Sequence, residues 1–223
     1  MSKLNTLELI ILFIVSLLIS GCNQSNYLSS SYSSTLNILS SQFTDQRSQI
    51  NRDLIETLPY ASSIISFGNN KKSLIILESA TSSKNTWISA DKIKLFEDNG
   101  RIIGSIGLPN DLYSIKSPAL DFKMIIEKGH ASHISYYSFR NPKLNNLRVE
   151  VKSILIGPEL VNILGFKKEL ILIEESLYSP LINWSAKNKF WYDPENEFVW
   201  KSRQYLTPKL PFIDVEVTKK PAQ

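Results

Sequence analysis

The sequence predicts an all-β protein, built mainly from antiparallel strands with one short N-terminal helix. Short apolar stretches recur every 8–12 residues or so between residues 62 and 217, and turn-forming residues separate them. One separator is Asn99-Gly100, a dipeptide that tolerates positive φ at both central turn positions. This pattern is typical of a barrel, a half-barrel or a sandwich.

The elements follow in order along the chain. Residues 45–58 have apolar residues at helical spacing and are followed by Pro59, so we expect a helix there. Residues 110–128 are less regular, with a short helix or turn near 120–126. The strands are expected over residues 62–67, 73–78, 86–90, 92–97, 101–106, 132–139, 147–156, 169–175, 189–192, 198–204 and 212–217.

The N-terminus carries an apolar run over residues 9–19, followed by the only cysteine, Cys22. The run is shorter than the roughly 20 residues that cross a bilayer but suits a signal peptide. Ile19-Ser20-Gly21-Cys22 resembles the lipobox of bacterial lipoproteins. The resemblance implies cleavage after Gly21 and acylation of Cys22 on its sulfur and its new amine, which anchors the protein in membrane lipid. The alternative is an uncleaved anchor with a chance cysteine.

The residues after Cys22 indicate location and domain organisation. Asn23 stands where lipoproteins retained in the inner membrane of enteric bacteria have Asp, so the resemblance implies the outer membrane, with the chain facing the periplasm. Serine-rich sequence follows, which is typical of a flexible tether. We therefore expect a signal peptide over 1–21, a tether over 22–44 and a single β domain over 45–223.

Composition and motifs exclude several functions. The net charge of +4 is spread out with no basic stripe, so no nucleic-acid partner is expected. The two histidines, His130 and His133, lie three apart and point to opposite sides of a strand, so neither a metal site nor a cofactor is predicted. No catalytic motif is present, and we expect no enzyme. A glycosidase whose two acids lie far apart in the sequence is the alternative.

Aromatic residues are the other candidates for function. Trp184, Trp191, Trp200 and Tyr137 are candidate contacts for a glycan or a protein partner, because exposed aromatic rings stack on sugars and suit interfaces. The alternative is that these aromatics fill a β core. Since neighbours alternate along a strand, either Tyr136 or Tyr137 should face outward.

Several short motifs, in a fixed order, resemble the YjbF/GfcB family of group 4 capsule lipoproteins. They are Leu58-Pro59-Tyr60-Ala61-Ser62, Trp87-Ile88-Ser89-Ala90-Asp91, Asn99-Gly100-Arg101-Ile102, Gly107-Leu108-Pro109, Trp191-Tyr192-Asp193-Pro194, Val199-Trp200-Lys201-Ser202-Arg203-Gln204 and Pro208-Lys209-Leu210-Pro211. The resemblance implies a half-barrel built on one large curved sheet, with Trp87 in its core. One departure is Lys92, where family members often have a glycine.

The resemblance also implies a role in making or exporting capsule or another exopolysaccharide. The expected function is a non-enzymatic accessory or assembly component, with an outer-membrane β-barrel protein and a periplasmic protein as partners. Three alternatives stay open: a module that binds the polysaccharide directly, a polysaccharide-modifying enzyme, and a carrier of lipid in the concave face of the sheet.

Overall fold

The structure is a computed structural model that describes residues 50–81, 84–118 and 121–222. All of them belong to one compact unit, Leu36–Gln223. The predicted signal peptide and tether, including Cys22, lie outside the described residues. Within the described ranges, no helix has both the length and the apolar character that crossing a bilayer requires.

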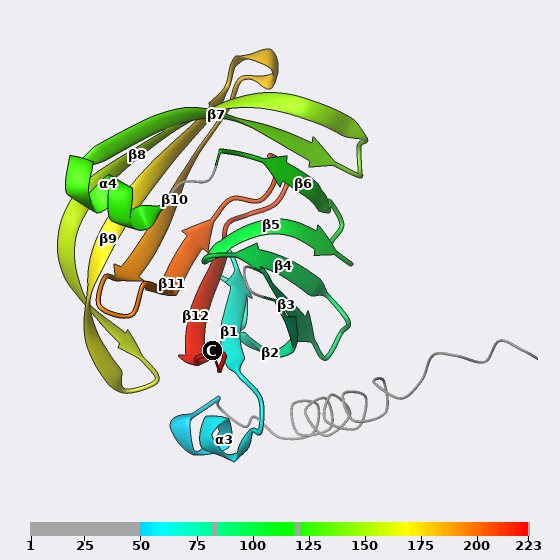
Figure 1. Cartoon of the computed structure of the whole chain (residues 1–223). Helices are drawn as coiled ribbons and strands as arrows, with labels where there is room; N and C mark the ends of the chain where they lie inside the picture. Colours follow the sequence, from blue (N-terminus) through cyan, green and yellow to red (C-terminus); the bar gives the residue numbers. More distant parts are fainter. Residues whose placement is uncertain (1–49, 82–83, 119–120, 223) are drawn as a thin grey trace, which may run out of the picture. The chain divides into compact units, whose positions relative to one another are not determined.

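The described chain forms a single 12-stranded antiparallel sheet with two short α-helices (Figure 1). The helices are α3 (Arg52–Thr57) and α4 (Phe122–Lys128), and a 3-10 turn, η1, covers Pro180–Ile182. The strands are β1 (Ser62–Phe67), β2 (Ser73–Ala80), β3 (Lys84–Ser89), β4 (Lys94–Asp98), β5 (Arg101–Ile106), β6 (Leu112–Lys116), β7 (His130–Phe139), β8 (Leu144–Ile163), β9 (Phe166–Ser179), β10 (Trp184–Asp193), β11 (Phe198–Gln204) and β12 (Ile213–Lys219).

The strand order is β5-β4-β3-β2-β1-β12-β11-β10-β9-β8-β7-β6, so the two edge strands, β5 and β6, are consecutive in the chain. They approach each other without joining the ladder. The hydroxyl of Ser105 on β5 accepts from the backbone N–H of Leu112 on β6 (3.0 Å) and donates to Asp111 (2.8 Å). The sheet is therefore a nearly closed barrel, and the predicted all-β, strongly curved fold is confirmed. We call the gap between β5 and β6 the seam.

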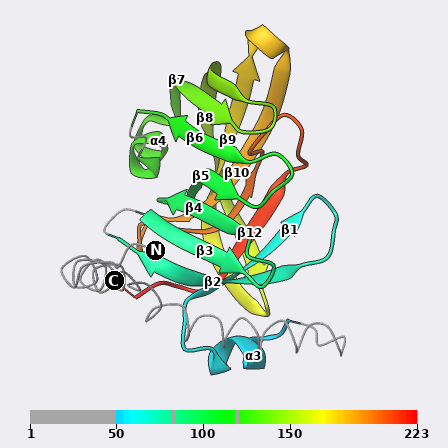
Figure 2. The ribbon, with the colours of Figure 1, turned by 90° about the vertical axis from the view of Figure 1, so that its right-hand side faces the viewer.

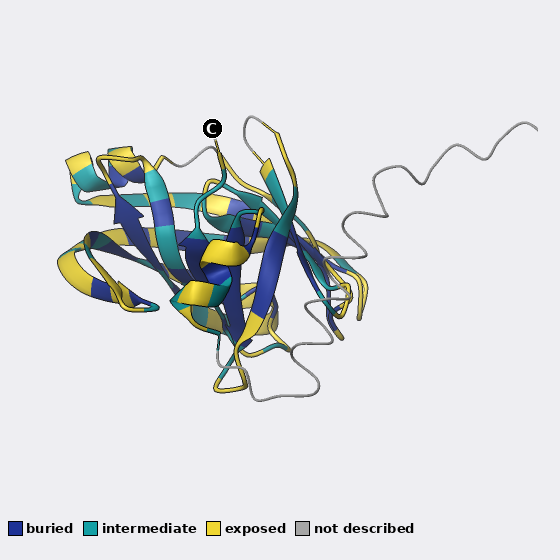
Figure 3. Ribbon diagram, turned by 90° about the horizontal axis from the view of Figure 1, so that it is seen from below, coloured by how far each residue is buried: buried dark blue, intermediate teal, exposed yellow. Residues whose placement is uncertain are grey.

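The main core packs side chains from both halves of the sheet, and Figure 3 shows the buried stretches of the strands in dark blue. Trp87 is 3% exposed in this core, as the family resemblance implied. A second cluster forms where α4 packs Phe122 and Ile125 against Phe190 on β10. The Asp121 side chain caps the start of α4 by accepting a hydrogen bond from the backbone N–H of Lys123 (2.9 Å), which stabilises the helix.

The structure differs from several predicted elements, and β9 and β10 are both longer than the predicted 169–175 and 189–192. Helix α3 is described only over Arg52–Thr57, capped by Asn51, and is shorter than the predicted 45–58. Strand β6 was not predicted, because its five residues lack a clear alternation. Strand β8 continues past residue 156 to Ile163. The β8–β9 register shifts between Leu155 and Gly157, which has φ 135°, and the pairing then continues.

The Asn99-Gly100 turn has the predicted positive φ values, 49° and 80°, and joins β4 to β5. A Cβ on Gly100 would lie 2.5 Å from the Cβ of Val199, which is buried. We expect Gly100→Ala to lower the free energy of unfolding by about 3 kcal/mol, from backbone strain and overpacking together. Urea unfolding measures this loss.

Gly165→Ala is the matched control for this substitution. Gly165 also has positive φ, 85°, but a Cβ there would meet nothing within 4 Å. Only the backbone strain of about 1–2 kcal/mol is then expected. Equal losses for the two variants would show that contact with Val199 contributes nothing.

Candidate functional site

A cavity of about 400 Å³ lies inside the curved sheet. Residues of both edge strands line it, so the seam borders the cavity. The opposite wall comes from β7 to β11. The lining residues are Lys84, Asp98, Asn99, Arg101, Ile102, Ile103, Ile115, Ser117, Pro118, Asp121, His133, Ser135, Tyr137, Val151, Glu175, Asn188 and Gln204. This is the size of a small-ligand pocket, and its lining is unusually polar for one.

An ion pair between Arg101 and Glu175 lies in the cavity wall. The Arg101 Nη1 to Glu175 Oε2 distance is 2.6 Å, and the Glu175 side chain is 2% exposed. Ser153 and Asn188 donate to the same carboxylate at 3.3 Å each. The charge of Glu175 is therefore compensated by a cation and two neutral donors, which a buried carboxylate requires.

Helix α4 and strand β10 hold Arg101 in place. The guanidinium carbon lies 4.8 Å from the ring centroid of Phe122 and 4.7 Å from that of Phe190, so an aromatic ring covers the cation from each of these elements. Its Nε and Nη2 are buried and have no hydrogen-bond partner among the described residues. The guanidinium thus keeps two unused donors beside the cavity.

His133 and Tyr137 face the cavity from β7. Burial lowers the pKa of His133; the charge of Glu175 opposes this shift and that of Arg101 adds to it. Its Nδ1 is buried and has no hydrogen-bond partner within the described part of the chain. Burial, and then the charge of Glu175, raise the pKa of Tyr137. Both side chains are therefore neutral at physiological pH.

Gln204 fixes the turn that carries Arg101. Its side chain accepts from the backbone of Ile102 (3.0 Å) and donates to the carbonyl of Gly100 (2.9 Å) and to Ser202 (2.8 Å). These bonds tie β11 to the start of β5 across the interior. The cavity wall is therefore pre-organised by side chains far apart in the sequence.

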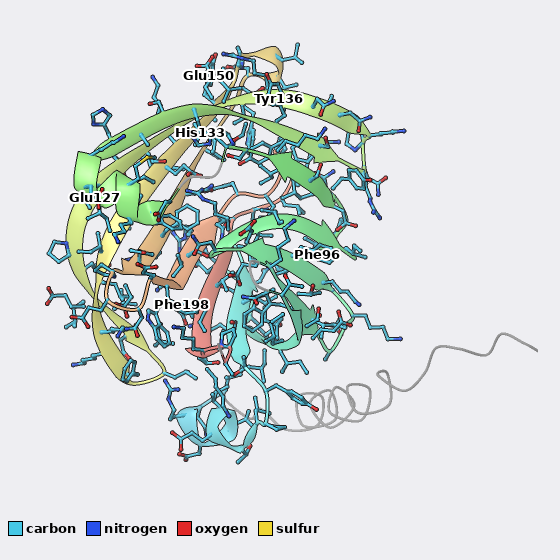
Figure 4. The ribbon with its side chains drawn as sticks, viewed as in Figure 1. Phe96, Glu127, His133, Tyr136, Glu150 and Phe198 are labelled. Atoms are coloured by element: carbon cyan, nitrogen blue, oxygen red, sulfur yellow. The ribbon has the colours of Figure 1, made fainter. Side chains whose placement is uncertain are left out.

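Two of the predicted contact residues, Tyr137 and Trp184, lie together on the inside. Tyr137 is 4% exposed, and its ring meets that of Trp184 edge-on with centroids 6.0 Å apart. Tyr136 is the outward-facing member of its pair, at 42% exposed (Figure 4). The expected alternation is confirmed, and it places Tyr137 against the interior cavity.

The other two, Trp191 and Trp200, lie together on the convex face. Trp191 is 7% exposed and packs with Val161, Ile163, Leu170 and Leu172. The half-buried ring of Trp200 contacts this cluster, and its Nε1 donates to Asp193 (3.1 Å). The four predicted residues therefore form two pairs on opposite faces of the sheet rather than one surface.

Comparison with known proteins identifies the family of this chain. A family described as "Group 4 capsule polysaccharide lipoprotein gfcB, YjbF" matches residues 33–218. The chain belongs to the YjbF/GfcB family of group 4 capsule polysaccharide lipoproteins. It is 24% identical over 212 residues to "Uncharacterized lipoprotein GfcB" of Escherichia coli (strain K12), covering 94% of this chain and 96% of that protein. The crystal structure of the hypothetical lipoprotein YmcC from Escherichia coli (K12) has the same fold, with a TM-score of 0.71 at 18% identity, over 91% of this chain and all of that one.

Two of the acidic residues that line the cavity of this YjbF/GfcB family member have structural partners. Glu175 is paired with Arg101, and Asp121 caps α4. Among the described residues, no group of three or more His, Cys, Asp or Glu side chains is placed to hold a metal ion.

Sequence reasoning missed the three residues that characterise this cavity. Arg101 and Glu175 are 74 positions apart, and the motif Asn99-Gly100-Arg101-Ile102 indicated a turn rather than a partner for the arginine. His133 was considered only as a metal ligand, but its Nδ1 is buried and its side chain lines the cavity. The one available signal was the strand position of Glu175, since its neighbour Glu174 points to the other face and pairs with Lys187 and Lys189.

A pH dependence of stability follows from Asp193, beside Trp200. Burial raises the pKa of its carboxyl, but donors from Lys168, Asn196 and Trp200 outweigh this and lower it to about 2. An Asp in the unfolded chain has a pKa of about 3.9, so the ionised form stabilises the fold by about 2 kcal/mol above that pH. We expect this stability to be lost as the pH falls from about 4 to about 2.

Urea unfolding between those pH values measures the loss. Asp193→Asn is the control, because it keeps the size of the side chain and removes its titration. The variant should be less stable at neutral pH and should lose less stability than the wild type below pH 4 or so. If the free energy of unfolding falls equally with pH in the wild type and in the variant, the pH dependence does not come from Asp193.

Proposed function

We propose that this protein is an outer-membrane lipoprotein, anchored through acylated Cys22 and facing the periplasm, that assists capsule or exopolysaccharide export without catalysing a reaction. Its partners in this proposal are an outer-membrane β-barrel protein and a periplasmic protein of the same secretion system. Location is set by the lipid, and the β domain provides the docking surface.

The single observation that carries this proposal is the family match, which spans nearly the whole β domain. The geometry of the interior supports a non-catalytic role. Glycosidases use two carboxyl groups about 5–10 Å apart, one that gives up a proton and one that acts as base or nucleophile. Here Glu175 accepts from Arg101, Ser153 and Asn188, so its oxygens are already engaged.

Deletion of the gene in its host tests the role in export. We expect polysaccharide on the cell surface to fall sharply, while polymer accumulates inside the cell, because synthesis does not need this protein. Complementation with the wild-type gene should restore surface polymer. Unchanged surface polysaccharide under capsule-inducing conditions would contradict the proposal.

A second candidate function is direct binding of the polysaccharide, and the polar cavity favours it. Buried donors without partners, such as Nε of Arg101, would bond to sugar hydroxyl or carboxylate oxygens. Calorimetric titration with oligosaccharides of the host polymer tests this function. Ile115→Trp, which would fill the cavity at the seam, should abolish the binding heat, whereas Tyr136→Ser on the outer side of β7 should leave it unchanged.

A further inference from the structure

The turn between β8 and β9 has an unusual sequence for its geometry. Leu164 and Gly165 join Ile163 to Phe166, and both have positive φ, 47° and 85°. Two-residue turns of this kind favour Asn, Asp or Gly, and the left-handed conformation costs another residue about 1–2 kcal/mol. A half-exposed Leu164 is therefore not explained by the folding of the turn itself.

Other apolar side chains are exposed at the same end of the hairpin. Leu160 is 66% exposed and Phe166 is 50% exposed. We call residues 160–169, which include these side chains and the turn, the hairpin tip. Exposed apolar groups gathered at one projecting end mark a contact surface.

The charges of the hairpin tip are ordered along its length. In the β8–β9 ladder, Lys167 lies opposite Asn162 and Lys168 lies opposite Val161. These are the first and second residue pairs after the Ile163–Phe166 pair that closes the turn. The acidic side chains lie further back: Glu169 pairs with Leu160, and Glu159 with Leu170. From the turn inward, the order is apolar at Leu164 and Phe166, then basic, then acidic, with Leu160 at the level of Glu169.

This order matches the polarity of a bilayer surface from inside to outside. In this arrangement the side chains of Leu164 and Phe166 lie at the boundary of the acyl chains, and Lys167 reaches the phosphate groups. Lys168 is held by Asp193 (2.9 Å), and carboxylates are favoured further out in water. A protein partner would not require this gradient.

The hairpin tip also lies where the N-terminal part of the chain enters the domain. Arg52, in the first turn of α3, donates to the carbonyl of Ile163 (3.0 Å) and to that of Thr218 (2.9 Å). Figure 2 shows α3 beside this end of the hairpin. The chain that leads from Cys22 therefore joins the described domain next to the hairpin tip, at the opposite end of β9 from η1.

We propose that the hairpin tip inserts into the headgroup region of the bilayer that carries the acylated Cys22. The inference rests on the proposed lipid anchor and adds the orientation of the β domain on the membrane. The 14 residues of β9, at most about 45 Å long, then lead away from the bilayer, so η1 lies on the periplasmic side.

Nitroxide labelling of the lipidated protein tests the orientation. Because the acylated Cys22 is the only native cysteine, a single introduced cysteine takes all of the label. Leu164→Cys and Phe166→Cys report on the hairpin tip, and Leu181→Cys, at a residue 76% exposed in η1, is the matched control. The proteins are reconstituted in vesicles of phosphatidylethanolamine and phosphatidylglycerol, and flotation confirms that they are bound.

We expect the labels at both tip positions to be relaxed more by oxygen, which concentrates in lipid, than by a water-soluble nickel chelate. The label at Leu181→Cys should show the reverse. A floating protein whose tip labels behave like the control would overturn the insertion and leave the anchor intact. Tip labels shielded from both relaxation agents would indicate a protein contact and would also overturn it. Failure to float would instead overturn the anchor.

Discussion

Replacing Cys22 by alanine is expected to remove the protein from the outer membrane and to reduce surface polysaccharide to the level of the gene deletion. Each buried CH₂ group of an acyl chain contributes about 0.8 kcal/mol, so losing several chains removes nearly all of the membrane affinity. Incorporation of a labelled fatty acid should also be lost. Membrane fractionation and labelling of the variant measure these effects.

Two controls separate the lipid from the fold. Ser20→Ala keeps a small residue before the cysteine and should be labelled and sorted like the wild type. A chain starting at residue 23 and secreted by a cleavable signal peptide should be folded and soluble in the periplasm, without restoring surface polysaccharide. A Cys22→Ala protein that still carries fatty-acid label in the outer membrane would refute the assignment of the lipid site.

Replacing Arg101 by methionine is expected to lower the free energy of unfolding by about 3–5 kcal/mol, because it leaves the carboxylate of Glu175 buried without its cation. The double variant Arg101→Met with Glu175→Leu should recover most of this loss, since it removes both charges. Urea unfolding of the single and double variants gives the coupling between the two residues.

The matched control is an exposed pair with the same geometry. The distance from Arg148 Nη1 to Glu150 Oε1 is also 2.6 Å, but the two side chains are 46% and 39% exposed. Arg148→Met should change stability by at most about 1 kcal/mol, because water already screens the pair. If the two arginine substitutions cost the same, burial of the Arg101 pair has no energetic role.

The sequence predicts the parts of this fold that depend on local chemistry. Asn99-Gly100 forms its turn because both residues accept positive φ, and the hairpins around residues 68–72, 141–146 and 193–197 occur where turn-forming residues separate apolar strands. Side chains alternate between the two faces of β7, and this correctly predicts that Tyr136 and Tyr137 lie on opposite faces. In each case, the information lies within a few neighbouring residues.

The cavity could not be predicted, because its chemistry depends on register between distant strands. Arg101 meets Glu175 only because the sheet curls until β5 and β9 face each other across the interior. A Glu174-Glu175 pair in a strand shows that one carboxylate points inward but does not identify its partner. The placement of Trp191 and Trp200 on the convex face depends likewise on the long β8–β9 hairpin that packs over them.

Lys92 has a backbone conformation that is unfavourable for lysine. It follows Asp91 in the β3–β4 turn and has φ 62°, in the left-handed region that glycine adopts without strain. Glycine, which the family resemblance implied for this position, is therefore the conformationally suited residue. This chain carries lysine there at the cost of some backbone strain.

The chemical structure of the polysaccharide made without this protein tests the central claim most directly. Polymer purified from the deletion strain and from the wild type is compared by nuclear magnetic resonance for its repeat unit and substituents. An accessory protein that acts by position predicts identical structures, with less polymer at the surface of the deletion strain. A polymer from the deletion strain that lacks a substituent or has altered linkages would show that the protein, or one that depends on it, performs chemistry on the polymer, and would contradict the account.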